Sequence, residues 1–452
     1  MIWDEFLFPL PDRRSFYSLE VYPCLNSRAS YRRCNAMLRV QAVICSKVCR
    51  SLSFCLVRLE LMHITIDGLA KEGDGVGRCP DGRAIFVRGA LLGEKVEVVT
   101  TEEKTKFLRG SAVSILEPNN HRIKPFCRHV QDGCGGCNLQ HADEELQKQI
   151  KLRITKEAYE RIGKFDSVLI KYGGGVEPVG YRTTVRCSVH DGRVGMRGFR
   201  SHDHIPLSYC GVAHERVEEI MMKSYFGDIE EVVIRTSILT GKSLAIVSAF
   251  DGSIETLKDV QVISFDQLRK GQSASIVERV YGKEWRVSAD SFFQASPQGS
   301  ELLVRSVEDI IKGNISASAS MIDLYSGVGI FAGTIGSGRQ VTAIEQNVSA
   351  TKDSIHNLGN AVDHVCSRVE QWEISPHNFV LANPSRSGMS KKVPNIIEQT
   401  GAEFVVLISC DAAAAARDAR RMVERGFQLG EVVVLDIFPQ TSHIEVISTF
   451  VR

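Results

Sequence analysis

The chain has 452 residues, more than a single hydrophobic core usually organises, so two or three domains are expected. Hydrophobic residues make up 43% of the chain and charged residues 24%, which is ordinary for a soluble globular protein. With a formal net charge of only +1, charge alone neither supports nor excludes nucleic-acid binding, and any basic surface for such binding must be local.

The first 61 residues differ from the rest, because scattered arginines and cysteines occur there without clear periodicity. No signal peptide is recognisable, and basic residues interrupt the apolar stretch 37–62, so we expect no membrane span and a cytoplasmic protein. We interpret residues 1–61 as an atypical extension, disordered or not native, that precedes a natural start at Met62. A poorly ordered native tail is the alternative.

From residue 62 to 118, short runs of Val, Ile and Phe alternate with glycine-rich turns. This pattern predicts a small five-stranded β-barrel, a fold that often binds single-stranded nucleic acid through a basic face. The basic side chains available for such a face are Lys71, Arg78, Arg83, Arg88, Lys104, Lys106 and Arg109. From charge alone, an ordinary solvated surface is the simpler interpretation.

Residues 119–290 are predicted to form a central α+β domain. Three cysteines with Cys-x6-Cys-x2-Cys spacing begin it, and this spacing suits an iron–sulfur cluster completed by a distant fourth cysteine. A tetrahedral zinc site is the competing interpretation. Apolar residues four apart predict a helix over 143–162, and residues 181–204 read as a basic hairpin.

From residue 291 to 452, apolar strands alternate with helices, which predicts a doubly wound α/β sheet. A glycine loop, Asp323–Gly329, follows one strand at the edge where such folds bind ligands. Glu345 ends the next strand, where a carboxylate can accept hydrogen bonds from ribose hydroxyls. The third glycine of a dinucleotide-binding motif is missing, so a nicotinamide cofactor fits poorly, and a plain turn remains the alternative to a cofactor loop.

Three further segments carry reactive side chains to the predicted edge. Asn383 follows a strand and precedes a proline, which is also typical of an ordinary turn. Cys410 lies between a strand and an alanine-rich helix, whose N-terminus is expected to lower the pKa of the thiol; a packed core cysteine is the alternative. His443 and Glu445 are both possible bases, and Glu445, on a half-buried strand, is better placed for a raised pKa.

In this combination and order, the motifs resemble the uridine-5 RNA methyltransferase family, in the iron–sulfur-containing branch that methylates ribosomal or transfer RNA. The resemblance covers residues 62–452 and rests on C-x6-CGGC, DSFFQ, DLYSGVG, the Asn-Pro pair, SCDAAAAARD and FPQTSHIEV. It implies an OB-like TRAM barrel at 62–118 and a class I methyltransferase domain with a Rossmann-like sheet at 291–452.

The resemblance also implies roles for single residues. The residues that would contact S-adenosylmethionine are Gln294, Tyr325, Glu345 and Asn383, the last at the boundary between cofactor and base. Cys410 would be the covalent nucleophile and Glu445 the base. The ligands of a [4Fe–4S] cluster, with zinc as the alternative, would be Cys127, Cys134, Cys137 and Cys210.

The chain departs from the family pattern at four places. Asn383 replaces the usual Asp, and Ser296 ends the family's Phe-x-Gln-x-Asn motif. The first cysteine spacing is six residues where five is commoner, and Ala412 replaces the usual Pro. Asn383 and Ser296 are expected to alter base recognition or to weaken activity.

The expected reaction forms 5-methyluridine by thiolate addition to uracil C6, methyl transfer to C5 and base-assisted elimination. A TRAM domain favours 23S rRNA over tRNA as the substrate, and a monomer is expected. Two other classes stay open: a decayed RNA-binding or ribosome-assembly protein, which Asn383 and Ser296 would favour, and a nicotinamide-dependent oxidoreductase.

Overall fold

The computed structural model describes residues 61–249 and 252–452. The interpretation of residues 1–61 as an extension therefore falls, apart from Leu61, outside the described ranges. Within those ranges, no helix combines the length and the apolar character that crossing a membrane requires.

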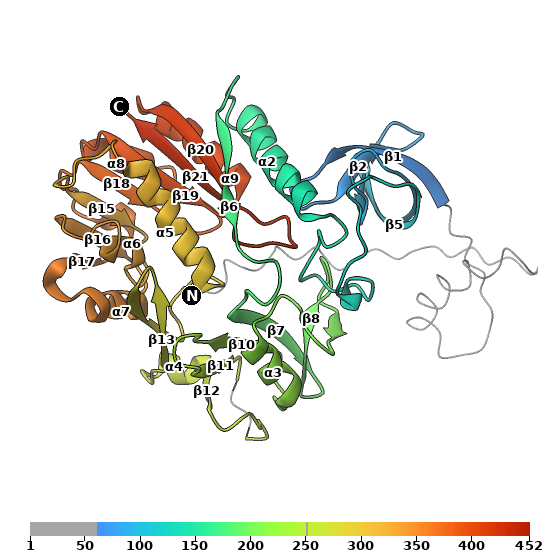
Figure 1. Ribbon diagram of the computed structural model, residues 1–452, viewed down its shortest axis with the longest axis horizontal. Coiled ribbons are helices and arrows are strands. Elements are labelled where there is room, and N and C mark those ends of the chain that lie inside the picture. The colour runs from blue at the N-terminus through green and yellow to red at the C-terminus, as the bar shows by residue number, and fades with distance from the viewer. Residues whose placement is uncertain (1–60, 250–251) are drawn as a thin grey trace, which may run out of the picture. The chain divides into compact units, whose positions relative to one another are not determined.

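The first five described strands close into a small barrel (Figure 1). They are β1 (Leu61–Leu69), β2 (Gly75–Arg78), β3 (Ala84–Arg88), β4 (Lys95–Glu103) and β5 (Phe107–Glu117). Side chains alternate between interior and solvent along each strand, so Ile64, Ile66, Ile85 and Val96 meet in the barrel core. The predicted five-stranded barrel is confirmed.

A connecting segment with the short helix η2 (Arg128–Val130) leads to the long helix α2 (Glu144–Arg161). The carboxylate of Asp143 caps α2 by accepting the Leu146 N–H at 2.8 Å. Ile150 and Ile154 lie on the buried face of this helix and pack into the same core as the large sheet. The helix predicted over 143–162 is therefore confirmed.

A six-stranded sheet follows, in the order β12-β11-β10-β7-β8-β9. Its strands are β7 (Thr184–His190), β8 (Arg193–Arg197), β9 (His204–Pro206), β10 (Glu231–Thr236), β11 (Ser243–Val247) and β12 (Val260–Ser264). The helices are α3 (Glu215–Lys223) and α4 (Phe265–Arg269), and β13 (Ser275–Val280) pairs with β14 (Lys283–Ser288). β7 and β8 form an antiparallel hairpin, as the basic segment predicted.

The largest sheet has eight strands in the order β17-β16-β15-β18-β19-β21-β20-β6. They are β6 (Ile170–Gly175), β15 (Met321–Leu324), β16 (Val341–Glu345), β17 (Asp363–Cys366), β18 (Phe379–Ala382), β19 (Phe404–Ser409), β20 (Gln428–Asp436) and β21 (Glu445–Val451). The strands from β17 to β19 are parallel, and β21 runs antiparallel to β19. The edge strand β6 comes from the segment that the sequence assigned to the central domain.

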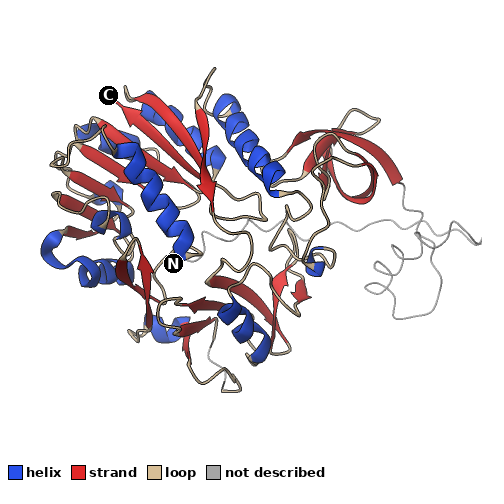
Figure 2. Ribbon diagram, viewed as in Figure 1, coloured by secondary structure: helices blue, strands red, loops and turns tan. Residues whose placement is uncertain are grey.

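Helices cover both faces of this sheet (Figures 1 and 2). α2, α8 (Val393–Gln399) and α9 (Ala412–Val423) share a core with one face, and α5 (Pro297–Ile311) and α6 (Ile330–Gly333) share a core with the other. The remaining helices are α7 (Val348–Leu358), η3 (Gly359–Ala361) and η4 (Val369–Gln371). This arrangement confirms the predicted doubly wound α/β architecture. The helices cover the two faces, so a ligand is expected at the carboxyl ends of the parallel strands.

Candidate active site

Predicted site residues from five neighbouring strands meet at one edge of the eight-stranded sheet. β16 ends at Glu345, β15, β18 and β19 lead to Tyr325, Asn383 and Cys410, and β21 begins at Glu445. In the antiparallel pair of β19 and β21, Ser409 faces Val446, so the next step of the register sets Cys410 against Glu445. The fold thus brings the predicted nucleophile and the predicted base together, two strands from the glycine loop.

The environment of Cys410 makes its thiol hard to ionise. Burial and the neighbouring carboxylate of Glu445 raise the pKa of the Cys410 thiol to about 12, while the Arg386 guanidinium acts in the opposite direction. The lowered pKa predicted from the helix N-terminus is therefore wrong for the free protein, because desolvation and negative charge outweigh the helix dipole. A thiolate at this position needs further positive charge, or a proton acceptor, in the substrate-bound state.

Glu445 is a buried carboxylate with few groups around it that could stabilise a negative charge. Its side chain is 1% exposed, and within the described residues Oε2 has no hydrogen-bond partner. Burial raises the pKa of Glu445 to about 8, in the direction that its strand position predicted. A carboxylate with a pKa near neutrality can take up and release a proton during turnover, which is the property of a general base.

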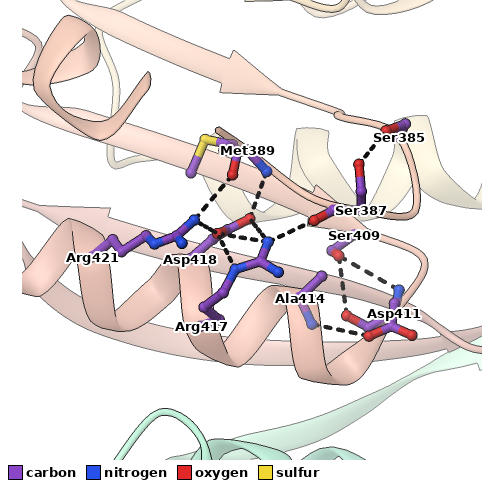
Figure 3. Close-up of polar contacts among 9 residues, drawn as sticks. All are labelled: Ser385, Ser387, Met389, Ser409, Asp411, Ala414, Arg417, Asp418 and Arg421. Atoms are coloured by element: carbon purple, nitrogen blue, oxygen red, sulfur yellow. Dashed lines mark hydrogen bonds and ion pairs between the residues drawn. The ribbon is translucent and has the colours of Figure 1, made fainter. Parts of the chain in front are cut away.

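The loop after β18 is tied to helix α9 by the buried carboxylate of Asp418 (Figure 3). Asp418 accepts the Met389 N–H at 2.7 Å and pairs with Arg417 and Arg421, each at 3.0 Å. The same two arginines donate to carbonyl oxygens of the loop at 2.6 and 3.0 Å. This network fixes the loop after β18 relative to the helix that begins just beyond the thiol.

The same loop carries Asn383 and Arg386 toward the site. The Asn383 N–H donates to the Leu324 carbonyl at 3.2 Å, which sets Asn383 beside the strand that leads into the glycine loop. Arg386 is only partly exposed, and its guanidinium forms no ion pair with any described residue. Its positive charge counteracts the rise in the pKa of the Cys410 thiol. The sequence analysis did not predict Arg386; the signal was a cation three residues after Asn383.

Glu345 both shapes the glycine loop and faces the predicted cofactor site. Its Oε2 accepts the Gly327 N–H at 2.9 Å, and its Oε1 accepts the Asn347 N–H at 2.7 Å. Burial raises the pKa of Glu345, and these backbone donors act against the rise. Each carboxylate oxygen keeps a second lone pair, so the side chain can also accept hydrogen bonds from vicinal hydroxyls.

The glycine loop itself has an unusual backbone. Tyr325, with φ of 64°, and Gly327, with φ of 57°, both adopt the left-handed region. At Gly329 a Cβ would come within 2.6 Å of the Ser354 Oγ, so only glycine allows the loop to approach α7. Asp323, fully buried, anchors the start of the loop by accepting the Ala332 N–H at 2.9 Å.

The segment that carries Gln294 contacts the start of α7 from outside the sheet. The Ser349 hydroxyl donates to the Asp290 carboxylate at 2.6 Å, so the segment around Gln294 lies at the start of α7, close to Glu345. Phe292, two residues before Gln294, is 61% exposed. An exposed aromatic ring in the segment that carries Gln294 is a surface on which a base can stack.

Ser296 has a structural explanation that the sequence did not provide. It is 2% exposed and caps α5, because its hydroxyl accepts the Gly299 N–H at 3.0 Å. Serine and asparagine are about equally good helix caps, so the replacement of the family's Asn keeps this contact. Ser296 therefore gives no support to a weakened active site.

The four cysteines of the predicted cluster come from the segment before α2 and the segment before α3. Cys134 and Cys137 are each 8% exposed, and Cys127 and Cys210 are partly exposed. Burial raises the pKa of Cys137 to about 12, and the thiols of Cys210 and Cys134 add to the rise. Among the residues with described positions, no three or more His, Cys, Asp or Glu side chains are grouped so as to hold a metal ion.

Residues 60–113 match the TRAM domain family. The chain is 30% identical to an uncharacterized RNA methyltransferase of Streptomyces coelicolor, over 86% of this chain and 92% of that protein. It is 25% identical to a protein of Yersinia enterocolitica named 23S rRNA (uracil(1939)-C(5))-methyltransferase, over 87% of this chain and 96% of that protein.

The fold is also similar to a crystal structure of a Pyrococcus abyssi tRNA (uracil-54, C5)-methyltransferase in complex with S-adenosyl-L-homocysteine. The TM-score is 0.68 over 86% of this chain and 100% of that chain, with 20% sequence identity. At this identity the likeness establishes a shared fold, which spans nearly all of the described residues.

Proposed function

The chain belongs to the RNA methyltransferase family, and we propose that it transfers the methyl group of S-adenosylmethionine to C5 of a uridine in RNA. The observation that carries this proposal is the opposition of Cys410 and Glu445 across β19 and β21, at the edge that also holds the glycine loop. A thiol, a base and a cofactor loop together are what this reaction requires, because uracil C5 is too weak a nucleophile unless C6 first receives an electron pair.

The reaction proceeds in three steps. The Cys410 thiolate bonds to C6, and the electron pair of the C5–C6 double bond moves into an enolate shared between C5 and O4. C5 then attacks the methyl carbon, and the bond from that carbon to the sulfonium sulfur breaks, which releases S-adenosylhomocysteine. Glu445 finally takes the C5 proton, the C5–C6 double bond re-forms, and the bond between C6 and the Cys410 sulfur breaks.

Two cations assist this chemistry. Arg386 favours the thiolate of Cys410, and the positive sulfonium of the cofactor adds to this effect once it is bound.

The uridine must leave its stack to reach the thiol, and the exposed ring of Phe292 offers a surface for the extruded base. Gln294, Tyr325, Glu345 and Asn383 are assigned to cofactor binding, with Asn383 also facing the base.

We propose 23S rRNA as the substrate. The TRAM match and the full-length similarity to a protein named as a 23S rRNA methyltransferase support this choice. Mass-spectrometric mapping of 5-methyluridine in total RNA, with and without the gene, tests it. Loss of a methylated uridine from 23S rRNA is expected, and loss from tRNA alone would reassign the substrate.

We also propose that Cys127, Cys134, Cys137 and Cys210 hold a [4Fe–4S] cluster. Neighbouring cysteines raise the pKa values of the Cys134, Cys137 and Cys210 thiols, and the burial of Cys134 and Cys137 suits donors to such a cluster. When bound, such a cluster would cross-link the segment before α2 to the segment before α3. Iron and sulfide analysis after anaerobic purification tests this, and a colourless protein with stoichiometric zinc would reverse it.

The catalytic assignment is tested with three variants. Cys410→Ala should abolish methyl transfer and retain binding of S-adenosylmethionine, whereas Cys366→Ala, which removes an exposed thiol, should remain active. Glu445→Gln should accumulate a covalent complex with RNA that migrates slowly on a denaturing gel. Full activity of Cys410→Ala would overturn the assignment of the nucleophile, and normal turnover of Glu445→Gln would point to another base.

A further inference from the structure

The residue directly after the predicted cluster ligand Cys137 reaches across the molecule to the segment that precedes Glu445. We call that segment, Phe438–His443, the base loop. The Asn138 side-chain oxygen accepts the Ser442 N–H at 2.9 Å, and its side-chain nitrogen donates to the Ser442 hydroxyl at 3.0 Å. One carboxamide therefore binds both the backbone and the side chain of Ser442.

The backbone around Asn138 adds to this attachment. The N–H groups of Asn138 and Leu139 both donate to the Gln440 carbonyl, at 3.2 and 3.0 Å. Gln440 has a φ of 69°, in the left-handed region that non-glycine residues rarely adopt. The buried side chain of Gln147 also accepts the Gln440 N–H at 2.8 Å, so the strained turn is held from two sides.

The barrel contributes the third element of this junction. The Asn138 side-chain nitrogen also donates to the carbonyl of Glu72, in the turn between β1 and β2. In the same turn, Gly73 has a φ of 80°, and a Cβ there would come within 3.3 Å of both Asn138 and Ser442. The barrel turn, the cysteine segment and the base loop therefore meet around one side chain.

The junction lies directly before Glu445 in the chain. Within the described residues the Glu445 Oε2 forms no hydrogen bond, so no polar contact of that oxygen orients the carboxylate. Glu445 is the first residue of β21, where it pairs with Leu435 of β20, and the base loop leads into this pair three residues after Ser442. We propose that Asn138 is a positioning residue for Glu445, and that it governs the proton-abstraction step of the proposed methylation.

This inference rests on the proposed function and makes a separate kinetic claim. Attack by Cys410 and methyl transfer come before proton abstraction, so loss of Asn138 should leave these early steps intact. Elimination should slow, because the carboxylate no longer sits at one place relative to C5. A residue with a merely structural role would lower all steps together.

The experiment is a single-turnover assay with labelled S-adenosylmethionine and a 23S rRNA fragment, in which methyl incorporation and denaturant-resistant RNA–protein complex are followed together. Asn138→Ala should transfer the methyl group within threefold of the wild-type rate, release product at least tenfold more slowly, and accumulate the methylated covalent complex. Asn138→Asp, which keeps the acceptor for the Ser442 N–H, should show a smaller accumulation. Gln149→Ala removes an exposed amide from α2 and should behave as wild type.

Ser442→Ala supplies an independent test if Asn138→Ala does not fold, because it removes only the contact with the Ser442 hydroxyl. It should accumulate the same complex to a lesser extent. A parallel fall of methyl transfer and release in these variants, or unchanged release, would overturn the role of Asn138. Failure of the wild-type protein to methylate RNA at all would instead overturn the proposed function.

Discussion

Replacing Glu445 by glutamine is expected to stabilise the folded protein at neutral pH, although it removes the proposed base. The carboxylate is 1% exposed, and Oε2 lacks a partner within the described residues, so ionising this group in the fold is unfavourable. Burial raises the pKa of Glu445 from 4.5 to about 8. Between these pH values the unfolded chain loses the proton and the folded chain keeps it.

The sign and size of the effect follow from this difference in bound protons. The unfolded state binds fewer protons than the folded state, so the free energy of unfolding falls as pH rises from 4.5 to 8. Each pH unit in that interval is worth about 1.4 kcal/mol, which amounts to about 3 kcal/mol at pH 7. Glutamine does not titrate, so Glu445→Gln does not lose this stability. The free energies of unfolding of the two proteins should therefore diverge as pH rises.

The measurement is urea-induced unfolding of both proteins at several pH values from 4.5 to 8. The difference in free energy of unfolding cancels the titration of all other groups, and Cys410, with its pKa near 12, does not ionise in this range. Glu284→Gln, at an exposed position, is the control and should show no such divergence. A difference that stays flat with pH would refute the description of Glu445 as a buried, raised-pKa carboxylate.

Three further results are expected. In the free protein at pH 7, iodoacetamide should alkylate Cys410 about a thousandfold more slowly than an ordinary thiol, because the pKa is near 12 instead of 9; peptide mass spectrometry would show this, and a rate plateau below pH 9 would contradict it. Asp418→Asn should lower the free energy of unfolding by about 2 kcal/mol, because Arg417 and Arg421 lose a buried partner; a chemical denaturation midpoint equal to wild type would disprove the tether. Lys71 belongs to the barrel, and its Nζ lies 3.5 Å from the Asp411 carboxylate while the side chain is 58% exposed, so we expect it to contact an RNA phosphate next to the site. Lys71→Ala should weaken RNA binding and reduce the slope of log affinity against log salt concentration by about 0.9. An unchanged slope would exclude the contact.

The sequence by itself determined the order of elements and pointed to the candidate reactive groups. Alternating apolar residues and glycine turns predict the barrel, and strands followed by glycine or proline predict the doubly wound sheet, because both signals depend on neighbours a few residues apart. Cys410 and Glu445 were recognisable for the same reason, since each lies in a local motif at a strand end. Cys410 comes to this edge because β19 is parallel to β18 and ends there, and Glu445 comes to the same edge because β21 runs antiparallel to β19 and begins there.

Only the tertiary structure decided how these groups behave. The pKa of Cys410 is raised instead of lowered, because burial and the charge of Glu445 depend on segments distant in the sequence. Asn138 and Ser442, 304 residues apart, meet only because the cysteine segment packs on the base loop. Desolvation, and hydrogen bonds across such separations, arise from packing, and no periodicity or motif in a single chain encodes them directly.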